Sequence, residues 1–296
     1  MSKAALKKIG PYRLVKLVHD GEASQVWKAY DDGAQQPVGI KTPTPKYRRS
    51  REQIGLLRRE YAVGAKLAHP CVLRIHRFGN DRGVPYLAME WFPAPNMKLR
   101  IHQGIDKMAP VLPKIILQAT EAVAYFNEQG WVHRDVKPEN FLIADSGDVK
   151  LLDFALARRK RGPLGRLFGQ RSRVQGTQSY MSPEQIRNWA LDERADLYSL
   201  ACTLFHLVAG NPPFAGVNTN DLFRRHLKSP PPSLEAANPR VTPAFSNLLR
   251  VAMAKKASDR PASARALLNQ LRQIPLFLDD PESPSSRAGT ATKSPA

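Results

Sequence analysis

The sequence predicts an α+β fold in which a small β-rich part precedes a larger, mainly helical part. Between residues 12 and 91, short segments rich in β-branched and aromatic residues alternate with turn residues, as strands do. From residue 96 onward, longer segments carry apolar residues at helical spacing. With 296 residues, the chain is long enough for one large domain or for two small lobes, and Pro93 and Pro95 favour a boundary near residue 94.

The composition indicates a strongly basic globular protein. Lys and Arg total 45 against 26 Asp and Glu, a formal charge of +19. This charge favours an anionic partner, for which nucleic acid, acidic or phosphorylated proteins and anionic lipid all qualify. A solvated basic surface without any partner explains the charge equally well.

The cysteines and the apolar runs bear on location. Cys71 and Cys202 lie in apolar contexts without metal-ligand spacing, which predicts buried thiols in a reducing compartment. No apolar run approaches the ~20 residues of a membrane helix. Residues 1–10 lack the apolar core of a secretory signal. Together these observations predict a cytoplasmic protein.

The β-rich part is expected to begin with two strands, over residues 12–19 and 25–30, joined by a turn at 20–23. A third strand at 37–41 ends in Lys41. Further strands are expected at 72–75 and 84–91. An amphipathic helix containing Glu60 is expected over residues 47–67, between the third strand and the strand at 72–75.

Helices dominate the expected second part. Their predicted ranges are 96–105, 111–129, 191–210, 218–228, 242–254 and 261–274. A hairpin of strands 141–143 and 149–152 interrupts them, because Asp145-Ser146-Gly147 favours a tight turn.

A polar loop, His133 to Asn140, lies between the apolar segments Trp131-Val132 and Phe141-Leu142-Ile143. Within it, Asp135 could accept a proton from an attacking hydroxyl, and Lys137 could neutralise charge on a transferring phosphoryl group. Asn140 offers a carbonyl oxygen to a hard metal ion. His133 is expected to be structural.

This loop resembles the catalytic loop of protein kinases, and its Lys-Pro-Glu-Asn ending is similar to the serine/threonine branch. Residues 176–185 look most like the bacterial serine/threonine kinases of eukaryotic type. The resemblance covers about residues 10–275 and implies a bilobal protein-kinase-like fold. Residues 1–94 would form a small β-rich N-lobe with one helix, and residues 95–275 a larger helical C-lobe. Residues 276–296, rich in Ser, Pro, Ala and Thr, are expected to be a disordered tail.

The resemblance also implies an activity, the transfer of the ATP γ-phosphoryl group to Ser or Thr hydroxyls of proteins, with ATP and Mg²⁺ as cofactors and with autophosphorylation. The basic charge favours acidic proteins among these substrates. Asp135 and Lys137 would be catalytic, and Asn140 and Asp153 would hold Mg²⁺. The residues implied to bind the nucleotide are Gly21, Val26, Lys41, Glu60, Met89, Glu90, Phe92 and Leu142.

Further members of the pattern are implied to support this site. Glu184 is expected to pair with Arg260 in the interior, and Asp196 to brace the catalytic-loop backbone. Thr177 is expected near Asp135. The segment 156–176 carries seven Lys and Arg residues and no acid, and its only hydroxyl is Ser172. We hypothesise that phosphorylated Ser172 pairs with Arg134.

Three departures from the kinase pattern favour an alternative, a pseudokinase that binds nucleotide or acts as a scaffold. His19 and Ser24 stand where glycines of the phosphate-covering loop are expected, which predicts a high KM for ATP. Gly64 replaces a bulky apolar residue, which predicts weak packing of its helix. Ala155 replaces a glycine and is expected to cost about 1–2 kcal/mol in a left-handed conformation. A second alternative is an adaptor that binds anions through the basic segment. The retained charged positions favour an active enzyme.

Overall fold

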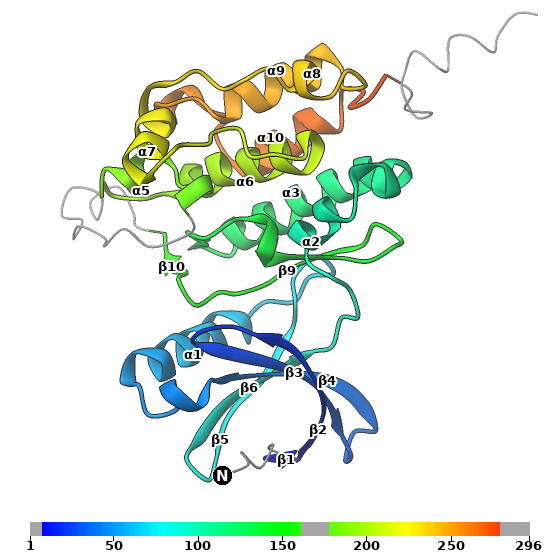
Figure 1. Ribbon diagram of the computed structural model, residues 1–296, viewed down its shortest axis with the longest axis vertical. Coiled ribbons are helices and arrows are strands. Elements are labelled where there is room, and N and C mark those ends of the chain that lie inside the picture. Colours follow the sequence, from blue (N-terminus) through cyan, green and yellow to red (C-terminus); the bar gives the residue numbers. More distant parts are fainter. Residues whose placement is uncertain (1–7, 161–177, 279–296) are drawn as a thin grey trace, which may run out of the picture. The chain divides into compact units, whose positions relative to one another are not determined.

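The computed structural model describes residues 8–160 and 178–278, and their contacts divide the chain into two compact units (Figure 1). The first unit comprises the chain up to Ala94 together with Lys150–Ala157. The second comprises Pro95–Val149 and the chain from Arg158 onward. The segment Lys150–Ala157 therefore groups with the first unit, although the boundary predicted near residue 94 places it in the later lobe.

A six-stranded antiparallel sheet forms the first unit, in the order β1-β2-β3-β4-β6-β5. Two register shifts in the pairing of β2 with β3 follow Leu14 and Leu17. The strands span β1 Lys8–Ile9, β2 Tyr12–Asp20, β3 Ser24–Asp31, β4 Gln36–Pro43, β5 Ile75–Asp81 and β6 Val84–Glu90.

The two faces of this sheet have different roles. One face is buried in an apolar cluster that includes Ile9, Tyr12, Ile40 and Tyr86. Because side chains alternate along a strand, Lys41 lies on the opposite face from Ile40. The sheet thus presents Lys41 on the face opposite this cluster, where Leu87, its direct neighbour on β6, is also buried.

The helix of the first unit, α1 Arg51–Gly64, packs on β5 and β6 and follows a short 3₁₀ turn, η1 Pro45–Tyr47. Its expected start at residue 47 was four residues early. The helix begins at Arg51 because the Ser50 side chain caps it, accepting a hydrogen bond from Gln53 N at 3.3 Å. The strand expected at 72–75 is reduced to a single bridge from Val72 to Leu151 before β5 begins.

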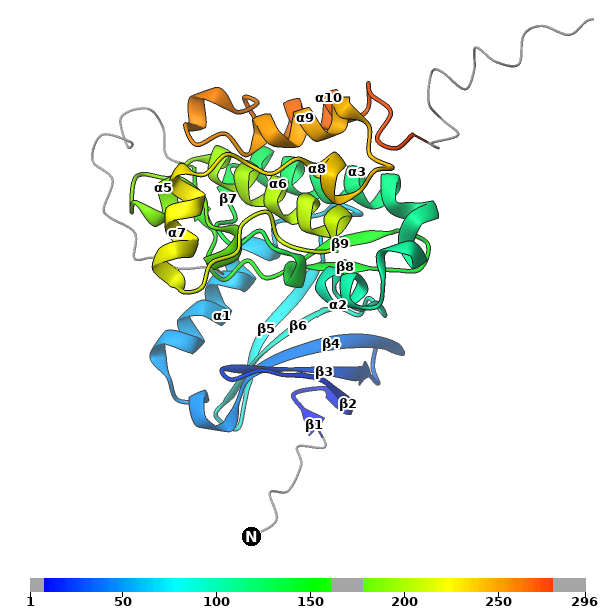
Figure 2. The ribbon, with the colours of Figure 1, turned by 45° about the horizontal axis from the view of Figure 1, so that its top comes forward.

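The second unit is mainly helical (Figure 2). Its α-helices are α2 Met97–His102, α3 Leu112–Glu128, α5 Pro183–Ile186, α6 Glu193–Ala209, α7 Thr219–Lys228, α8 Leu234–Ala237, α9 Pro243–Ala252 and α10 Ala264–Leu271. The 3₁₀ helices are η2 Ile105–Val111, η3 Pro138–Asn140, η4 Gln178–Tyr180 and η5 Ala257–Asp259.

Helix α6 is the centre of this unit, because every residue from Ala195 to Val208 is buried. It packs against α3, α9 and α10. Its N-terminus is capped by Asp192, whose side chain accepts from Arg194 N, and Gly210 ends it with a φ of 78°. A left-handed glycine at this position is a common way to terminate a helix. The helix therefore provides a rigid base for the loops that contact it.

Short strands flank the polar loop. β7 Trp131–Val132 precedes it and pairs with β10 Arg158–Arg159, and β8 Phe141–Ile143 follows it. β9 Val149–Leu151 comes after a tight turn in which Gly147 adopts a φ of 80°. The predicted position of the loop between two short strands is confirmed.

The α+β, protein-kinase-like fold expected from the sequence is confirmed. The expected disorder is wrong at its start, because Leu276 and Phe277 are buried. Thr242 N donates to Leu276 O at 3.1 Å, and the Phe277 ring packs against Phe245. The tail from residue 279 lies outside the described residues. Among the described helices, none has both the length and the apolar character needed to cross a membrane.

Candidate active site

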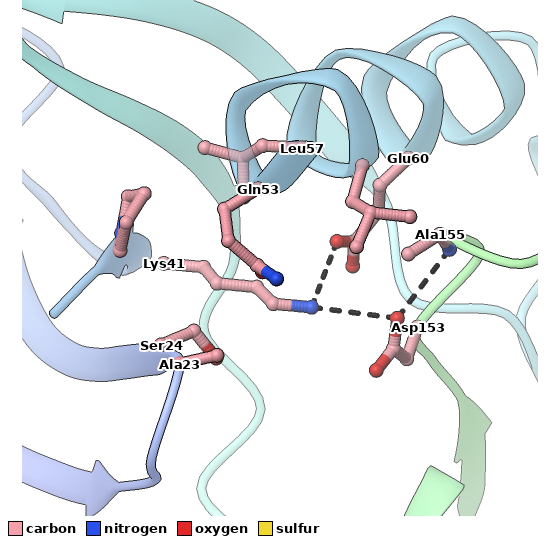
Figure 3. Close-up of a pocket in the computed structure, with 10 residues that line it drawn as sticks. Ala23, Ser24, Lys41, Gln53, Leu57, Glu60, Asp153 and Ala155 are labelled. Atoms are coloured by element: carbon pink, nitrogen blue, oxygen red, sulfur yellow. Dashed lines mark hydrogen bonds and ion pairs between the residues drawn. The ribbon is translucent and has the colours of Figure 1, made fainter. Parts of the chain in front are cut away.

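Three charged side chains that are far apart in the sequence meet in the first unit (Figure 3). Lys41, near the end of β4, places its Nζ 2.8 Å from Glu60 Oε2 on α1 and 3.4 Å from Asp153 Oδ1, two residues after β9. Burial by itself disfavours the charged amine, but the Asp153 and Glu60 carboxylates raise the pKa of Lys41 above its ordinary value. Lys41 is therefore an ammonium ion held between two acids.

A cavity of about 130 Å³ opens beside this ammonium. Besides these three charged side chains, the cavity is lined by small, apolar and amide side chains: Ala23, Ser24, Pro43, Gln53, Leu56, Leu57 and Ala155. At roughly 30 Å³ per water molecule, the volume admits a small polar group. The cavity thus offers an anion direct access to a fixed positive charge.

The β2–β3 turn above this cavity is tied to neighbouring backbone. Gly21 N donates to Ser24 O at 3.0 Å and closes the turn. Thr44, after β4, donates its backbone N to Ala23 O and its Oγ1 to Glu22 O, each at 3.0 Å. The turn that lacks two of the expected glycines is therefore held in place from β4.

The prediction that Gly64 weakens the packing of its helix is wrong. A Cβ added at Gly64 would lie 2.3 Å from Ile75 Cγ1 and 3.0 Å from Phe154 Cδ2, so no space is left there. Ile75, from β5, fills the volume in which a side chain at position 64 would lie, and Phe154 is fully buried beside it. Gly64 therefore packs closely against Ile75 and leaves no cavity.

The strain expected at Ala155 is also absent. Within residues 150–157, the only residue with a positive φ is Asp153, at 66°. Aspartate tolerates this left-handed region better than most residues. Ala155 N donates to Asp153 Oδ1 at 3.4 Å. The substitution of glycine by alanine therefore does not require a left-handed alanine.

The remaining residues expected around the nucleotide lie as follows. Val26 is in register with Lys41 across β3 and β4, and Met89 is buried in β6. Glu90 binds Lys150 Nζ at 2.8 Å and accepts from Arg74 N at 3.1 Å. The centre of the Phe92 ring lies 5.9 Å from Lys150 Nζ. Leu142, in the second unit, forms an isolated β-bridge with Asn96.

The polar loop of the second unit brings its three predicted residues together. Lys137 Nζ lies 2.7 Å from Asp135 Oδ2. Asn140 Nδ2 donates to Asp135 O at 2.7 Å and to Asp135 Oδ2 at 3.2 Å. The Asp135 side chain remains 11% exposed, so it is oriented by its partners and still open to a reactant. This arrangement suits an acid–base carboxylate beside a fixed cation.

Asp196, on α6, braces the backbone of this loop. Its carboxylate accepts from His133 N at 2.7 Å, from Arg134 N at 2.8 Å and from Asn127 Nδ2 at 2.9 Å. Arg134 has a φ of 71°, and Gln185 Nε2 donates to its carbonyl at 2.9 Å. The two bonds from Asp196 to the loop backbone agree with the sequence-based expectation. Asn127 and Gln185 were not predicted, because an amide that binds backbone has no charge signature in the sequence.

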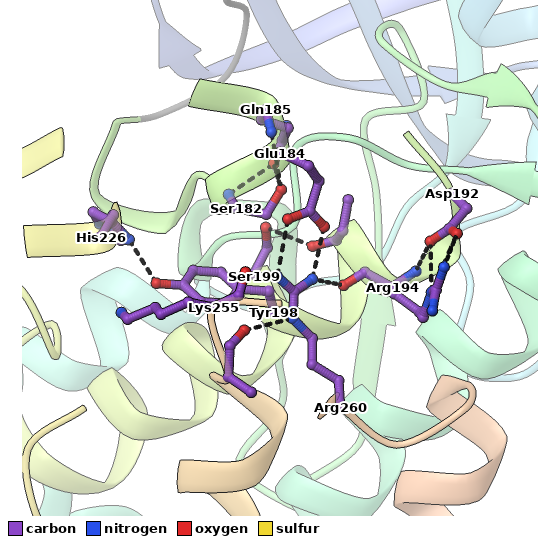
Figure 4. Close-up of polar contacts among 12 residues, drawn as sticks. Ser182, Glu184, Gln185, Asp192, Arg194, Tyr198, Ser199, His226, Lys255 and Arg260 are labelled. Carbon is purple, nitrogen blue, oxygen red and sulfur yellow. Dashed lines mark hydrogen bonds and ion pairs between the residues drawn. The ribbon is translucent and has the colours of Figure 1, made fainter. Parts of the chain in front are cut away.

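The pair Glu184–Arg260 lies in the interior of the second unit (Figure 4). Two parallel bonds join them, Nη1 to Oε1 at 2.6 Å and Nη2 to Oε2 at 2.9 Å. The Arg260 side chain is 0% exposed and also donates to the carbonyls of Ala254 and Arg194. Bidentate geometry with added carbonyl partners is what a buried guanidinium requires.

A second cation lies close to this pair. The Lys255 Nζ is 4.1 Å from the centre of the Phe214 ring and 5.7 Å from that of Tyr198. This ammonium is buried and has no hydrogen-bond partner among the residues that the structure describes. Burial lowers the pKa of Lys255 to about 8. The site therefore disfavours the charged form of Lys255 relative to an exposed lysine.

Ser172 and Thr177, expected to take part in regulation and substrate positioning, lie outside the described residues. Within the described ranges, no three His, Cys, Asp or Glu side chains cluster as metal ligands. Hard oxygen ligands are instead available singly, at Asn140 and Asp153.

The described fold and site define a protein kinase, and comparison with known proteins agrees. The protein kinase domain model matches residues 12–272, so the chain belongs to the protein kinase family. Among solved structures, a point mutant of the kinase domain of Mycobacterium tuberculosis PknI is similar, with a TM-score of 0.67 and 25% identity. That similarity covers 92% of this chain and 99% of the PknI chain.

The sequence relatives are bacterial serine/threonine-protein kinases. A probable serine/threonine-protein kinase of Streptomyces coelicolor is 31% identical over 86% of this chain and 38% of its own length. PknL of Mycobacterium tuberculosis is 31% identical over 92% of this chain and 67% of its own length. PrkC of Bacillus subtilis is 30% identical over 86% of this chain and 39% of its own length. The chain thus spans less than half the length of several relatives.

Proposed function

We propose that this chain transfers the γ-phosphoryl group of ATP to Ser or Thr hydroxyls of proteins and autophosphorylates. The observation that carries the proposal is the contact of Lys41 with both Glu60 and Asp153. Phosphoryl transfer relies on fixed charges that position the phosphates and offset the charge of the transition state. An ammonium held by two acids at the edge of a cavity supplies such a charge.

The polar loop would carry the reacting groups. Asp135 would orient the acceptor hydroxyl and take its proton on a carboxylate oxygen. Lys137, 2.7 Å away, would offset charge on the transferring group. The hydrogen bonds from Asp196 to the loop backbone would keep both side chains oriented, so that most of the rate gain comes from positioning.

The residues present suit Mg²⁺. The side-chain nitrogen of Asn140 donates to Asp135. The side-chain oxygen of Asn140 therefore points away from Asp135 and is available as a metal ligand. Asp153 would contribute a carboxylate oxygen. Amide and carboxylate oxygens are the hard donors that Mg²⁺ prefers. When bound, Mg²⁺ neutralises charge on the β- and γ-phosphates.

The alternative is a pseudokinase that binds nucleotide without transferring phosphate. The observation that favours it is the β2–β3 turn, in which His19 and Ser24 replace glycines. The retained contacts of Lys41, Asp135 and Asn140 favour the enzyme.

Transfer of ³²P from ATP to a basic and to an acidic protein substrate, and to the chain itself, tests the proposal. We expect incorporation by the unchanged protein and its loss in Asp135→Asn, with ATP binding retained in both. ATP binding without incorporation by the unchanged protein would favour the pseudokinase.

The formal charge of +19 supports acidic substrates, and the paired assay with acidic and basic substrates tests that preference. Salt-sensitive binding of nucleic acid or anionic vesicles that survives Asp135→Asn would instead support the adaptor. The cytoplasmic location stays a prediction.

A further inference from the structure

His19 lies on the same face of the first unit's sheet as Lys41. The register pairs His19 with Val26 across β2 and β3, and Val26 with Lys41 across β3 and β4. Directly opposed residues in antiparallel strands direct their side chains to the same face. The exposed imidazole is therefore two strands from Lys41, on the face opposite the apolar cluster.

The imidazole also lies against the β2–β3 turn. A Cβ added at Gly21 would be 2.8 Å from His19 Nε2, so the turn has a glycine where the ring approaches its backbone. Gly21 N is already engaged with Ser24 O. The turn thus uses within itself a backbone donor of the kind that a glycine-rich loop presents to phosphate.

The acids of the same turn have other partners. Asp20 Oδ1 accepts from Gln25 Nε2 at 2.9 Å, and Glu22 Oε1 lies 3.4 Å from the Tyr47 hydroxyl. Both contacts draw the carboxylates toward side chains other than His19. Histidine offers an N–H donor in its neutral form and two in its cationic form.

We propose that the His19 side chain binds the phosphates of ATP, providing the donor that the substituted turn no longer offers from its backbone. This inference rests on the proposed function and adds a phosphate-binding residue to it. It reverses the expectation drawn from the glycine pattern. If His19 merely replaces a glycine that would contact phosphate, then His19→Gly should tighten ATP binding. If the His19 side chain itself binds phosphate, then His19→Gly should weaken ATP binding.

The test is the dissociation constant for adenosine, ADP and ATP, measured by calorimetry on the full chain and on His19→Gly and His19→Gln. We expect ATP binding to weaken about three- to tenfold in His19→Gly, the net effect of one ordinary solvent-exposed hydrogen bond. Adenosine binding should stay within about twofold, because adenosine lacks phosphate. His19→Gln, which keeps a donor, should retain part of the affinity for ATP.

A matched control is His76→Gln, an exposed histidine on β5, which should leave all three constants unchanged. Equal losses for adenosine and ATP would assign His19 a structural role and overturn the inference. Unchanged or tighter ATP binding in His19→Gly would overturn it as well. If the unchanged protein bound adenosine and ATP equally weakly, the proposed function itself would fail, a result distinct from both.

Discussion

The close fit at Gly64 makes a sharp prediction about stability. Gly64→Ala adds a Cβ 2.3 Å from Ile75 Cγ1, whereas carbon atoms in contact lie about 3.5–4.0 Å apart. Cγ1 is the second atom of a β-branched side chain, so it cannot move without a shift of the backbone or of α1. Overpacking of this kind costs about 1–3 kcal/mol. Gly64 is the last residue of α1, where the gain in helix propensity is small. We expect a net loss of about 1–2 kcal/mol.

A double-mutant cycle isolates the contact. Ile75→Ala by itself should cost about 2–4 kcal/mol, because it leaves a cavity beside Phe154. In the double variant the new Cβ at position 64 occupies part of that cavity. The double variant should therefore be more stable than the sum of the single effects by at least about 1 kcal/mol.

Urea unfolding followed by tryptophan fluorescence gives the required free energies. Gly55→Ala is the matched control, because Gly55 is an exposed residue of the same helix with nothing within 4 Å of an added Cβ. That substitution should stabilise the chain by about 0.5–1 kcal/mol. If Gly64→Ala stabilised the chain as Gly55→Ala does, or if the double-mutant cycle were additive, the packing argument would be refuted.

Three further predictions concern other contacts. Arg260→Ala should lower the free energy of unfolding by about 3–5 kcal/mol, because it leaves Glu184 buried without its partner; a loss below about 1 kcal/mol would contradict this. Lys255 has a folded pKa of about 8 against an ordinary 10.5, so between these values the unfolded chain binds more protons and stability rises with pH. After allowance for partial exposure, we expect the free energy of unfolding to rise by about 1–2 kcal/mol over this pH range. Urea unfolding measures it, and Lys255→Met should not show this rise. Thr44→Val removes the bond to Glu22 O and should raise the KM for ATP about two- to fivefold in a transfer assay; an unchanged KM would show that this bond does not position the turn.

The charged contacts were the most predictable part of the site. Lys41 and Glu60 were both implied to take part in nucleotide binding, and the structure brings them to 2.8 Å of each other. The pairing of Glu184 with Arg260 was likewise implied by the kinase resemblance, and their bidentate contact agrees with it. Such residues can be assigned in advance because their chemistry restricts their neighbours.

Packing was less predictable. The void expected at Gly64 does not exist, because Ile75 comes from another element and fills it. The tie from Thr44 to the β2–β3 turn consists of bonds from its backbone N and its hydroxyl to turn carbonyls, which no sequence signal announces. Leu276 looked like the start of a tail, but it is buried in the second unit. In each case the deciding neighbour is distant in the sequence.

The discontinuity of the first unit affects how the chain folds during synthesis. Asp153 and Phe154 belong to this unit, yet the ribosome makes them only after all of Pro95–Val149. Until then Lys41 has Glu60 but lacks its second acid, and the contact of Gly64 with Phe154 cannot form. Because nascent chains fold as their segments emerge, the first unit reaches its final interior only after the Pro95–Val149 part of the second unit has left the exit tunnel.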